Sequence, residues 1–184
     1  MHPEPSTRRP HPKRTHILLI DDHPLVRERL AEVIQREPDL AVCGEAEDRH
    51  QALDSIRSRK PGLAIVDLTL KNSDGLDLIA DMNTRWPDLP ILVVSMHDES
   101  LYAERALRAG ARGYITKQEA TRSILRAIRR VLQGDIYLPQ HVATEILSRL
   151  AGPAAPANAA EVNCGSRASA TTLHWTRSLS ERRN

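Results

Sequence analysis

Short apolar runs alternate with longer amphipathic segments from residue 16 onward. Three of these runs, Ile17–Ile20, Leu63–Val66 and Ile91–Val94, contain only aliphatic residues. Such runs are typical of central strands in a parallel sheet that is covered on both faces. Two more runs, Leu40–Cys43 and Arg112–Thr116, have the length and composition of flanking strands. The pattern therefore predicts five strands.

The residues between these runs follow the periodicity of an α-helix. In the segment 24–36, Val26, Leu30 and Ile34 recur every four residues, and Pro24 suits the first helical position. Stripes of the same kind, clear in some and weak in others, occur in four further segments, namely 49–58, 74–86, 98–109 and 118–132. Five helices thus alternate with five strands, and proline and glycine residues separate many of them.

This alternation predicts an α/β fold with a doubly wound parallel sheet. Because crossovers between parallel strands are right-handed, the natural small solution is the flavodoxin-like (βα)5 arrangement with strand order 2-1-3-4-5. After Gly134, residues 135–150 are expected to form a connector and one short C-terminal helix. The apolar residues of that helix are predicted to share a single face, namely Val142, Ile146, Leu147 and Leu150.

Charge and composition divide the chain into four parts. The net charge of the 184 residues is +2, but the basic excess lies at the two ends and the middle is acidic. Residues 1–15 are expected to be a disordered basic arm, 16–134 a folded domain, 135–150 the connector and helix, and 151–184 a disordered tail. The arm could contact nucleic acid or acidic lipid, although an unattached terminus is the simpler interpretation.

Targeting and redox features favour a cytoplasmic protein. No apolar run approaches the ~20 residues of a membrane span, and the N-terminus lacks the apolar core of a signal peptide. The two cysteines, Cys43 and Cys164, are far apart and have no metal-binding spacing.

Chemically useful side chains follow the predicted strands at one edge of the sheet. Asp21 and Asp22 come directly after the first strand, and Asp67 after the third. Ser95 ends the fourth strand, and Lys117 follows the fifth. In an open parallel sheet, ligands bind outside the carboxyl ends of the strands, where the winding direction switches. We therefore expect three carboxylates, a hydroxyl and an ammonium group to converge there.

Three neighbouring carboxylates repel one another unless a cation lies between them. A donor set of oxygens alone indicates Mg²⁺, which takes few carboxylates and also binds phosphate oxygens. A lysine and a serine could neutralise and hydrogen-bond the other oxygens of a phosphoryl group. Because a carboxylate can itself attack phosphorus, the set suits formation of an aspartyl phosphate.

Five stretches at these positions resemble the receiver domain of two-component response regulators, specifically the NarL/FixJ (LuxR-type) subfamily. They are IDDHPLVR at 20–27, VDLTLKNSDGLDLI at 66–79, VVSMHDE at 93–99, AGARGYITKQEA at 109–120 and AIRRVLQGDIYLP at 127–139. The stretches occur in the right order at the right element ends. The resemblance covers about residues 16–150.

The resemblance implies a role for each site residue. Asp67 would be the phosphoacceptor, taking a phosphoryl group from a sensor histidine kinase or a small phosphodonor. The Mg²⁺ site would comprise Asp22 directly, Asp21 largely through water, Asp67, and the backbone carbonyl of Thr69. Lys117 would bind a phosphoryl oxygen, and Ser95 and Tyr114 would be the switch residues. Phosphorylation would shift the population of the face formed by the fourth helix, fifth strand and fifth helix. A homodimer is a further possible partner, and the sequence does not reveal whether phosphorylation would cause it.

Several of these residues also have ordinary interpretations. Asp21 could be a helix N-cap, because a proline that suits the first turn follows shortly after. Lys117 could be a solvated lysine at the start of a helix, and Tyr114 a half-buried aromatic residue. His23, which follows the acidic pair, indicates a positioning or surface role.

The function classes left open differ in output and chemistry. The leading hypothesis is a signalling switch, not an enzyme in the usual sense, with self-catalysed phosphoryl transfer and slow autodephosphorylation. A helix-turn-helix output domain needs about 60 residues, whereas residues 151–184 show no helical stripe and end in SLSERRN, which resembles the start of such a domain. Sequence-specific DNA binding by this chain is therefore not expected. The alternatives are a truncated transcriptional regulator, a phosphorylation-independent interaction module, and a phosphatase of the haloacid-dehalogenase kind. The last is disfavoured because its D-x-D motif is replaced here by adjacent aspartates.

Overall fold

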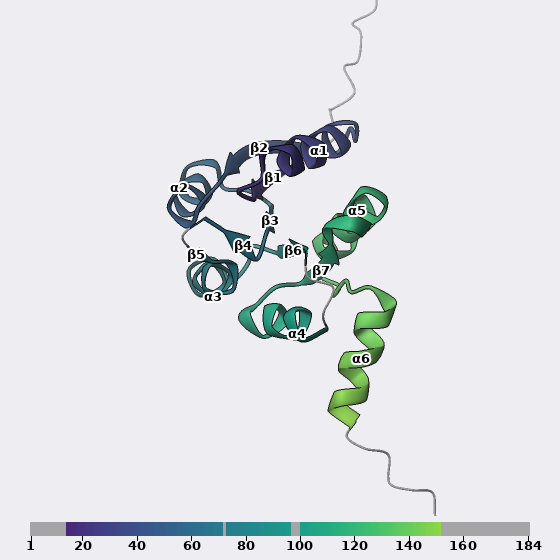
Figure 1. The fold of residues 1–184 in the computed structure, drawn as a ribbon. Helices are drawn as coiled ribbons and strands as arrows, with labels where there is room; N and C mark the ends of the chain where they lie inside the picture. The colour runs from purple at the N-terminus through teal and green to yellow at the C-terminus, as the bar shows by residue number, and fades with distance from the viewer. Residues whose placement is uncertain (1–13, 72, 97–99, 152–184) are drawn as a thin grey trace, which may run out of the picture. The chain divides into compact units, whose positions relative to one another are not determined.

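A five-stranded parallel sheet forms the centre of the fold in the computed structural model (Figure 1), which describes residues 14–71, 73–96 and 100–151. The strands are β1 (Thr15–Ile20), β2 (Leu40–Ala46), β3 (Leu63–Val66), β6 (Ile91–Ser95) and β7 (Gly113–Thr116). Their order is β2-β1-β3-β6-β7, and every adjacent pair is parallel. Because β4 and β5 form a separate hairpin, this is the predicted order 2-1-3-4-5. The predicted fold class is confirmed.

Helices cover both faces of the sheet (Figure 1). One face carries α1 (Pro24–Gln35) and α5 (Lys117–Leu132), and the other carries α2 (Arg49–Arg59), α3 (Gly75–Arg85) and α4 (Ser100–Ala109). Two aliphatic cores result, one on each side of the central strands. They form because β1, β3 and β6 are apolar on both faces: Leu18 and Ile20 face the α2–α4 side, whereas Ile17 and Leu19 face the α1–α5 side.

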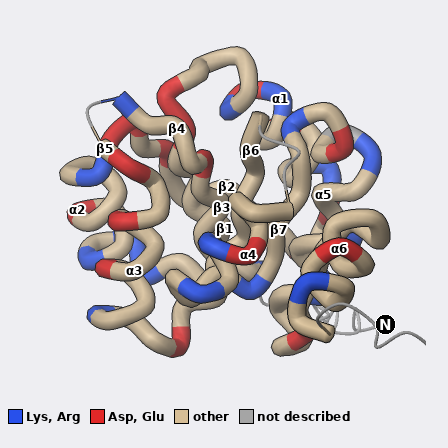
Figure 2. Tube along the Cα trace, turned by 60° about the horizontal axis from the view of Figure 1, so that its bottom comes forward, with Lys and Arg blue, Asp and Glu red and all other residues tan. Residues whose placement is uncertain are grey.

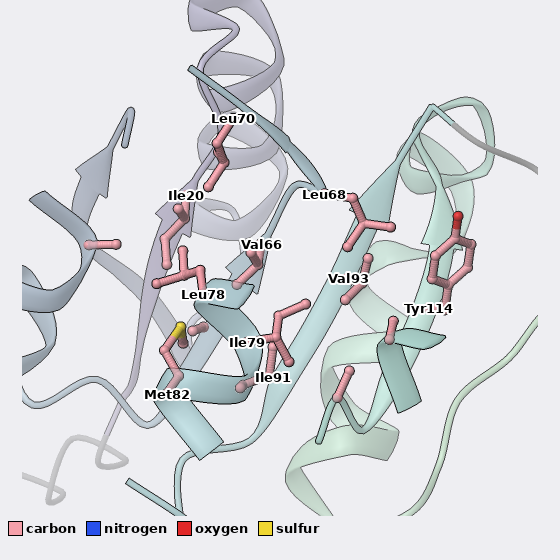
Figure 3. Packing of buried hydrophobic residues seen from close by; sticks show 14 of the residues in the cluster. Ile20, Val66, Leu68, Leu70, Leu78, Ile79, Met82, Ile91, Val93 and Tyr114 are labelled. Carbon is pink, nitrogen blue, oxygen red and sulfur yellow. The ribbon is translucent and has the colours of Figure 1, made fainter. Parts of the chain in front are cut away.

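The core on the α2–α4 side is built mainly from branched aliphatic residues, since the chain contains no Phe. Figure 3 shows Ile20 and Val66 of the sheet close to Leu78 of α3. Met82 of α3 and Tyr114 of β7 belong to the same cluster, and both are fully buried. Burial of a large aliphatic side chain contributes about 1.5–3 kcal/mol, so these contacts hold the strand ends in place.

A short antiparallel hairpin that the sequence pattern does not predict lies between β3 and α3. It consists of β4 (Thr69–Leu70) and β5 (Ser73–Asp74). Asp74 then caps α3, because its Oδ1 accepts a hydrogen bond of 2.8 Å from the backbone N–H of Leu76. The helix predicted for the segment 74–86 thus begins at Gly75. The hairpin leads the chain away from Asp67 and back into the helix.

The connector after α5 pairs with β7, and the final helix packs on α4. Tyr137 forms an isolated parallel bridge with Gly113 and accepts a hydrogen bond of 2.9 Å from the N–H of Tyr114. Helix α6 (Gln140–Ala151) then lies beside α4 (Figure 1). Val142 and Ile146 are buried against it.

Two apolar residues of α6 are exposed. Leu147 and Leu150, predicted to share one face of the helix with Val142 and Ile146, are 65% and 69% exposed. The contact with α4 covers a narrower stripe than the sequence pattern suggests. The predicted basic arm and C-terminal tail lie outside the described residues, apart from positions 14, 15 and 151.

Acidic and basic residues are interspersed along the helices (Figure 2). Many of them pair within a helix, as do Arg36 with Glu32 and Arg108 with Glu104. Exposed pairs of this kind contribute little to stability. No helix within the described ranges is long and apolar enough to cross a membrane.

Candidate functional site

The carboxyl ends of β1, β3 and β7 bring Asp21, Asp67 and Lys117 together. Lys117 Nζ lies 2.8 Å from Asp21 Oδ2 and 2.7 Å from Asp67 Oδ2. The three side chains are nearly buried, with exposed fractions of 5%, 1% and 6% for Asp21, Asp67 and Lys117. The sequence predicted this convergence from strand ends alone.

Backbone hydrogen bonds fix the two aspartates in register. The N–H of Asp67 donates to the carbonyl of Ile20 at 2.8 Å, and the N–H of Asp21 donates to the carbonyl of Ala46 at 3.1 Å. Each aspartate is thus held one residue beyond its strand by the neighbouring strand. Their position follows from sheet pairing, not from loop conformation.

Asp21 combines the predicted site role with a local structural one. Its Oδ1 accepts a hydrogen bond of 2.8 Å from the backbone N–H of His23, the N-cap residue of α1, while its Oδ2 contacts Lys117. The interpretation of Asp21 as the N-cap residue of α1 is wrong, because His23 occupies that position. Asp21 nevertheless helps to shape the start of that helix.

Asp22 and His23 complete an acidic cluster. His23 Nδ1 lies 2.7 Å from Asp22 Oδ1 and 3.1 Å from Asp21 Oδ1. One oxygen from each of the three aspartates and one nitrogen of His23 all lie within 4.8 Å of one another. The adjacent aspartates are thus part of the same pocket as Asp67.

Charge and burial oppose each other in this pocket. Burial raises the pKa of Asp67, and the negative charge of Asp21 adds to this, while the hydrogen bond from Lys117 acts in the opposite direction. For Lys117, burial acts to lower the pKa, but hydrogen bonds to Asp21 and Asp67 outweigh it and leave the pKa raised. Three carboxylates thus face one ammonium group, and the pocket favours a further cation.

Unsatisfied oxygens support the fit of a divalent ion. Asp67 Oδ1 is buried and accepts no hydrogen bond from the residues that the structure describes, and the buried Asp22 Oδ1 lies 2.7 Å from the ring nitrogen Nδ1 of His23. Buried polar atoms are normally paired with protein, water or an ion. Hard carboxylate oxygens are the ligands that Mg²⁺ prefers. Thr69, the predicted carbonyl ligand, is the first residue of β4, two positions after Asp67.

The two predicted switch residues lie on β6 and β7, which are neighbouring strands. Ser95 ends β6, is fully buried and lies in register with Thr116, the residue before Lys117. Tyr114 lies on β7 and is 0% exposed, so the interpretation as a half-buried aromatic is wrong (Figure 3). Among the described residues, Tyr114 has the largest fully buried side chain.

Sequence reasoning missed Arg27 as a support of the site. Its guanidinium is largely buried and donates to the backbone carbonyl of Asp21 at 2.6 Å. It also pairs with Glu45 and Glu47, each at 2.9 Å. An arginine within a helical stripe carries no signal for such a role, because its partners lie on β2 and the following loop.

The fold and the pocket define a class of protein. A flavodoxin-like sheet carries an acidic pair, a third aspartate and a lysine at its carboxyl edge, which is the arrangement of a receiver domain. A family model described as the response regulator receiver domain matches residues 17–129, and the chain belongs to this family. It is a signalling module and not an enzyme of the classical kind.

Two of the curated relatives are named as regulators of transcription. The transcriptional activator protein ExaE of Pseudomonas putida is 37% identical over 130 residues, which cover 71% of this chain and 61% of that protein. The transcriptional regulatory protein DegU of Brevibacillus brevis is 30% identical over 131 residues, covering 71% of this chain and 56% of that protein. This chain therefore spans less than two thirds of the length of these relatives.

Solved structures share the fold. A LuxR-family two-component response regulator from Aurantimonas sp. SI85-9A1 has a TM-score of 0.71 at 33% identity, covering 76% of this chain and all of that chain. The isolated receiver domain of RcsB from Salmonella enterica serovar Typhimurium, with phosphomimetic BeF3⁻, has a TM-score of 0.66 at 24% identity. That comparison covers 72% of this chain and 98% of that chain and supports the fold alone.

Proposed function

We propose that this chain is a receiver in a two-component phosphorelay that accepts a phosphoryl group on Asp67. The observation that carries the proposal is the state of this one carboxylate. It is buried at the ligand-binding edge of the sheet, with Oδ2 held by Lys117 and Oδ1 without a hydrogen-bond donor. A carboxylate held in this way is oriented for attack and has low access to bulk water.

The proposed transfer is a displacement at phosphorus. An oxygen of the Asp67 carboxylate forms the new O–P bond while the bond from phosphorus to the donor breaks, and the bonding pair leaves with the donor group. That group is the imidazole of a kinase phosphohistidine or the acetate of acetyl phosphate. Lys117 neutralises negative charge on a phosphoryl oxygen as the bond forms. Asp21, Asp22 and Asp67, with the carbonyl of Thr69, would hold Mg²⁺, which would supply further positive charge to the transferring phosphoryl group.

The proposed output is a change in the face formed by α4, β7 and α5. Ser95 and Tyr114 lie on neighbouring strands that lead into this face, and both are fully buried. A new phosphoryl group at Asp67 offers an acceptor that the hydroxyl of Ser95 can follow. Tyr114 then repacks, and the population of the two arrangements shifts.

Intact-mass measurement after incubation with Mg²⁺ and acetyl phosphate tests the acceptor. The wild-type chain should gain one phosphoryl group. Asp67→Asn should gain none, and Asp22→Ala should be labelled more slowly because its Mg²⁺ affinity falls. Asp77→Asn, an exposed carboxylate on α3, is the matched control and should label like the wild type. An unchanged mass gain in Asp67→Asn would refute the assignment.

Two other functions give different results in the same experiment. Steady multiple turnover of phosphate esters would favour a phosphatase. A complete lack of labelling with normal folding would favour a phosphorylation-independent interaction module. The acidic pair, the third aspartate and the lysine converge here, which supports the switch over both.

The proposed phosphodonor partner is a sensor histidine kinase or a small phosphodonor, acting in the cytoplasm. A homodimer is also proposed. DNA recognition is not proposed for this 184-residue chain. In a gel-shift assay the intact chain should show no sequence preference, and a footprint at a defined site would contradict that expectation.

A further inference from the structure

We infer that His23 is a fourth ligand of the acidic pocket and shifts its metal preference from Mg²⁺ toward borderline ions such as Zn²⁺ and Co²⁺. The inference deepens the proposed function because it concerns the same pocket. It depends on where the imidazole ring lies, which the sequence alone did not indicate.

The ring of His23 is directed into the acidic cluster. Its Nδ1 lies 2.7 Å from Asp22 Oδ1, 3.1 Å from Asp21 Oδ1 and 4.0 Å from Asp67 Oδ2. His23 is the N-cap residue of α1, yet its side chain makes no capping hydrogen bond. The usual local role of a polar residue at this position is therefore not what orients the ring.

The spacing of the donor atoms suits a single ion. Ligand atoms that each lie about 2.0–2.2 Å from one ion are at most about 4.4 Å apart. The four candidate atoms of Asp21, Asp22, His23 and Asp67 lie within 4.8 Å of one another. Small side-chain rotations would bring all four into one coordination sphere.

An independent observation indicates that the pocket lacks a partner. Asp67 has a side chain that is 1% exposed, and its Oδ1 accepts no hydrogen bond from the described residues. Lys117 contacts the Oδ2 atoms of Asp21 and Asp67. The Oδ2 of Asp67 that the lysine holds is also the oxygen 4.0 Å from Nδ1 of His23, whereas Oδ1 of the same carboxylate remains without a donor.

The chemistry of the donor set decides which ion is favoured. Mg²⁺ prefers oxygen ligands and keeps several waters, so a neutral imidazole adds little to its binding. Zn²⁺ and Co²⁺ accept imidazole nitrogen readily and bind mixed nitrogen and oxygen sites more tightly than Mg²⁺. An ion held by four protein ligands also has fewer positions open for a phosphoryl oxygen. A bound borderline ion should therefore slow phosphoryl acceptance compared with Mg²⁺.

The rival interpretation is a hydrogen bond alone, in which protonated Nδ1 donates to Asp21 or Asp22. The two roles can be separated by substitution. His23→Ala removes both, whereas His23→Asn keeps a hydrogen-bond donor but removes the imidazole. His50→Ala is the control, since His50 on α2 is 88% exposed and pairs with Asp54. The chain has eight histidines, and the seven that are not substituted remain unchanged in each variant.

Titration calorimetry with Mg²⁺ and with Zn²⁺, on the full chain, measures the ratio of the two affinities. The affinity for Zn²⁺ divided by the affinity for Mg²⁺ should fall at least about tenfold in both His23→Ala and His23→Asn. Even residues that only support a metal ligand indirectly contribute ten- to a hundredfold to metal affinity. The ratio should not change in His50→Ala. The visible absorption of bound Co²⁺ should shift in the two His23 variants, because a nitrogen ligand is lost.

Three outcomes would overturn the inference. The first is a wild-type chain that binds Zn²⁺ no more tightly than Mg²⁺. The second is a ratio of Zn²⁺ to Mg²⁺ affinity that does not change in His23→Ala, and the third is a ratio that does not change in His23→Asn. The failure of the proposed function is a separate result, namely a wild-type chain that acetyl phosphate and Mg²⁺ do not label. Either proposal can therefore fail while the other stands.

Discussion

Asp67 is a single residue whose charged form is disfavoured by its surroundings in the fold. Burial and a neighbouring carboxylate disfavour its charged form, although Lys117 compensates in part. Groups with a shifted pKa are often found at functional sites, where a ligand or a reaction can offset the unfavourable burial of their charge. The stability of the ion-free protein should therefore depend on the charge of this residue.

Asp67→Asn should stabilise the ion-free protein at neutral pH. Because the folded-state pKa lies above the ordinary value, protonation of Asp67 stabilises the fold below the ordinary pKa, and this stabilisation is lost as the pH rises through the folded-state pKa. Asparagine keeps the neutral form at every pH. Urea unfolding in EDTA should show an advantage for the variant at pH 7.5 that shrinks as the pH falls toward the ordinary pKa of an aspartate. An advantage that grows toward acid would contradict the sign of the shift.

Gly75 should be needed for the path of the chain next to Asp67. A Cβ atom at this position would lie 2.5 Å from the carbonyl oxygen of Asp67 and 2.6 Å from the Cα of Leu68, both of them backbone atoms. Gly75→Ala should therefore destabilise the protein by about 1–3 kcal/mol, the usual cost of overpacking, and should also slow phosphorylation.

The matched control is Gly44→Ala. Its Cβ would approach the flexible end of the Arg59 side chain at 2.9 Å, which can move away. Thermal unfolding and labelling by acetyl phosphate should distinguish the two variants. Equal behaviour of the two would mean that the backbone at Asp67 tolerates displacement.

The elements differ in how far their sequence patterns predicted them. Helices with a clear apolar stripe, such as α1 and α5, were predicted to within one residue at either end. The β4–β5 hairpin was not, because its two-residue strands are too short to show alternation. Strand β2 continues past the predicted Cys43 to Ala46, through Gly44 and Glu45, which carry no apolar signal. The pairing with β1 shifts register between Ile17 and Leu18, so that residues 44–46 pair with residues 18–20.

Helix α6 depends on tertiary contacts as well as its own pattern. Val142 and Ile146 are buried, and Arg149 links the helix to α4 through a hydrogen bond to Ser100 and an ion pair of 3.6 Å with Glu104. Ser100 is the first residue of α4 and is nearly buried. Arg149 thus connects the last turns of α6 to the start of α4.

Arg149→Ala should loosen α6 without unfolding the sheet. The loss of one partly buried hydrogen bond and a weak ion pair should reduce local stability by about 0.5–1.5 kcal/mol. Amide hydrogen exchange should become faster in residues 142–148 and stay unchanged in β1 and β3. Arg57→Ala, which removes an exposed pair with Asp54 on α2, is the control. Similar exchange in α6 of both variants would show that Arg149 does not hold the helix.

At the scale of the whole molecule, the sequence predicted the sheet order and the site together. Strand ends in a parallel sheet share one edge, so Asp21, Asp67 and Lys117 could be assigned to one pocket before their distances were known. The directions of His23 and Arg27 could not be predicted. Their side chains depend on partners that are brought close only by folding, and neither residue stands at a strand end.

Ion binding should stabilise the whole fold, since the pocket joins three strands. A ligand that binds only the folded state stabilises it by about 2.7 kcal/mol at a concentration about 100 times its dissociation constant. The unfolding midpoint of the wild-type chain should therefore rise with Mg²⁺ concentration. Asp22→Ala should lose most of this dependence, whereas Asp77→Ala on the surface of α3 should keep it. A midpoint independent of Mg²⁺ in the wild type would argue against an ion site at this edge.

The bridge between Tyr137 and Gly113 bears on how molecules of this kind can associate. Exposed margins of β-sheets readily recruit foreign polypeptide by backbone pairing, which is a common route to aggregation and domain swapping. Here the protein's own chain already occupies the outer hydrogen-bonding groups at Tyr114 and Arg112. A partner that docks next to β7 must therefore contact helix side chains, unless residues 135–139 first separate from the strand.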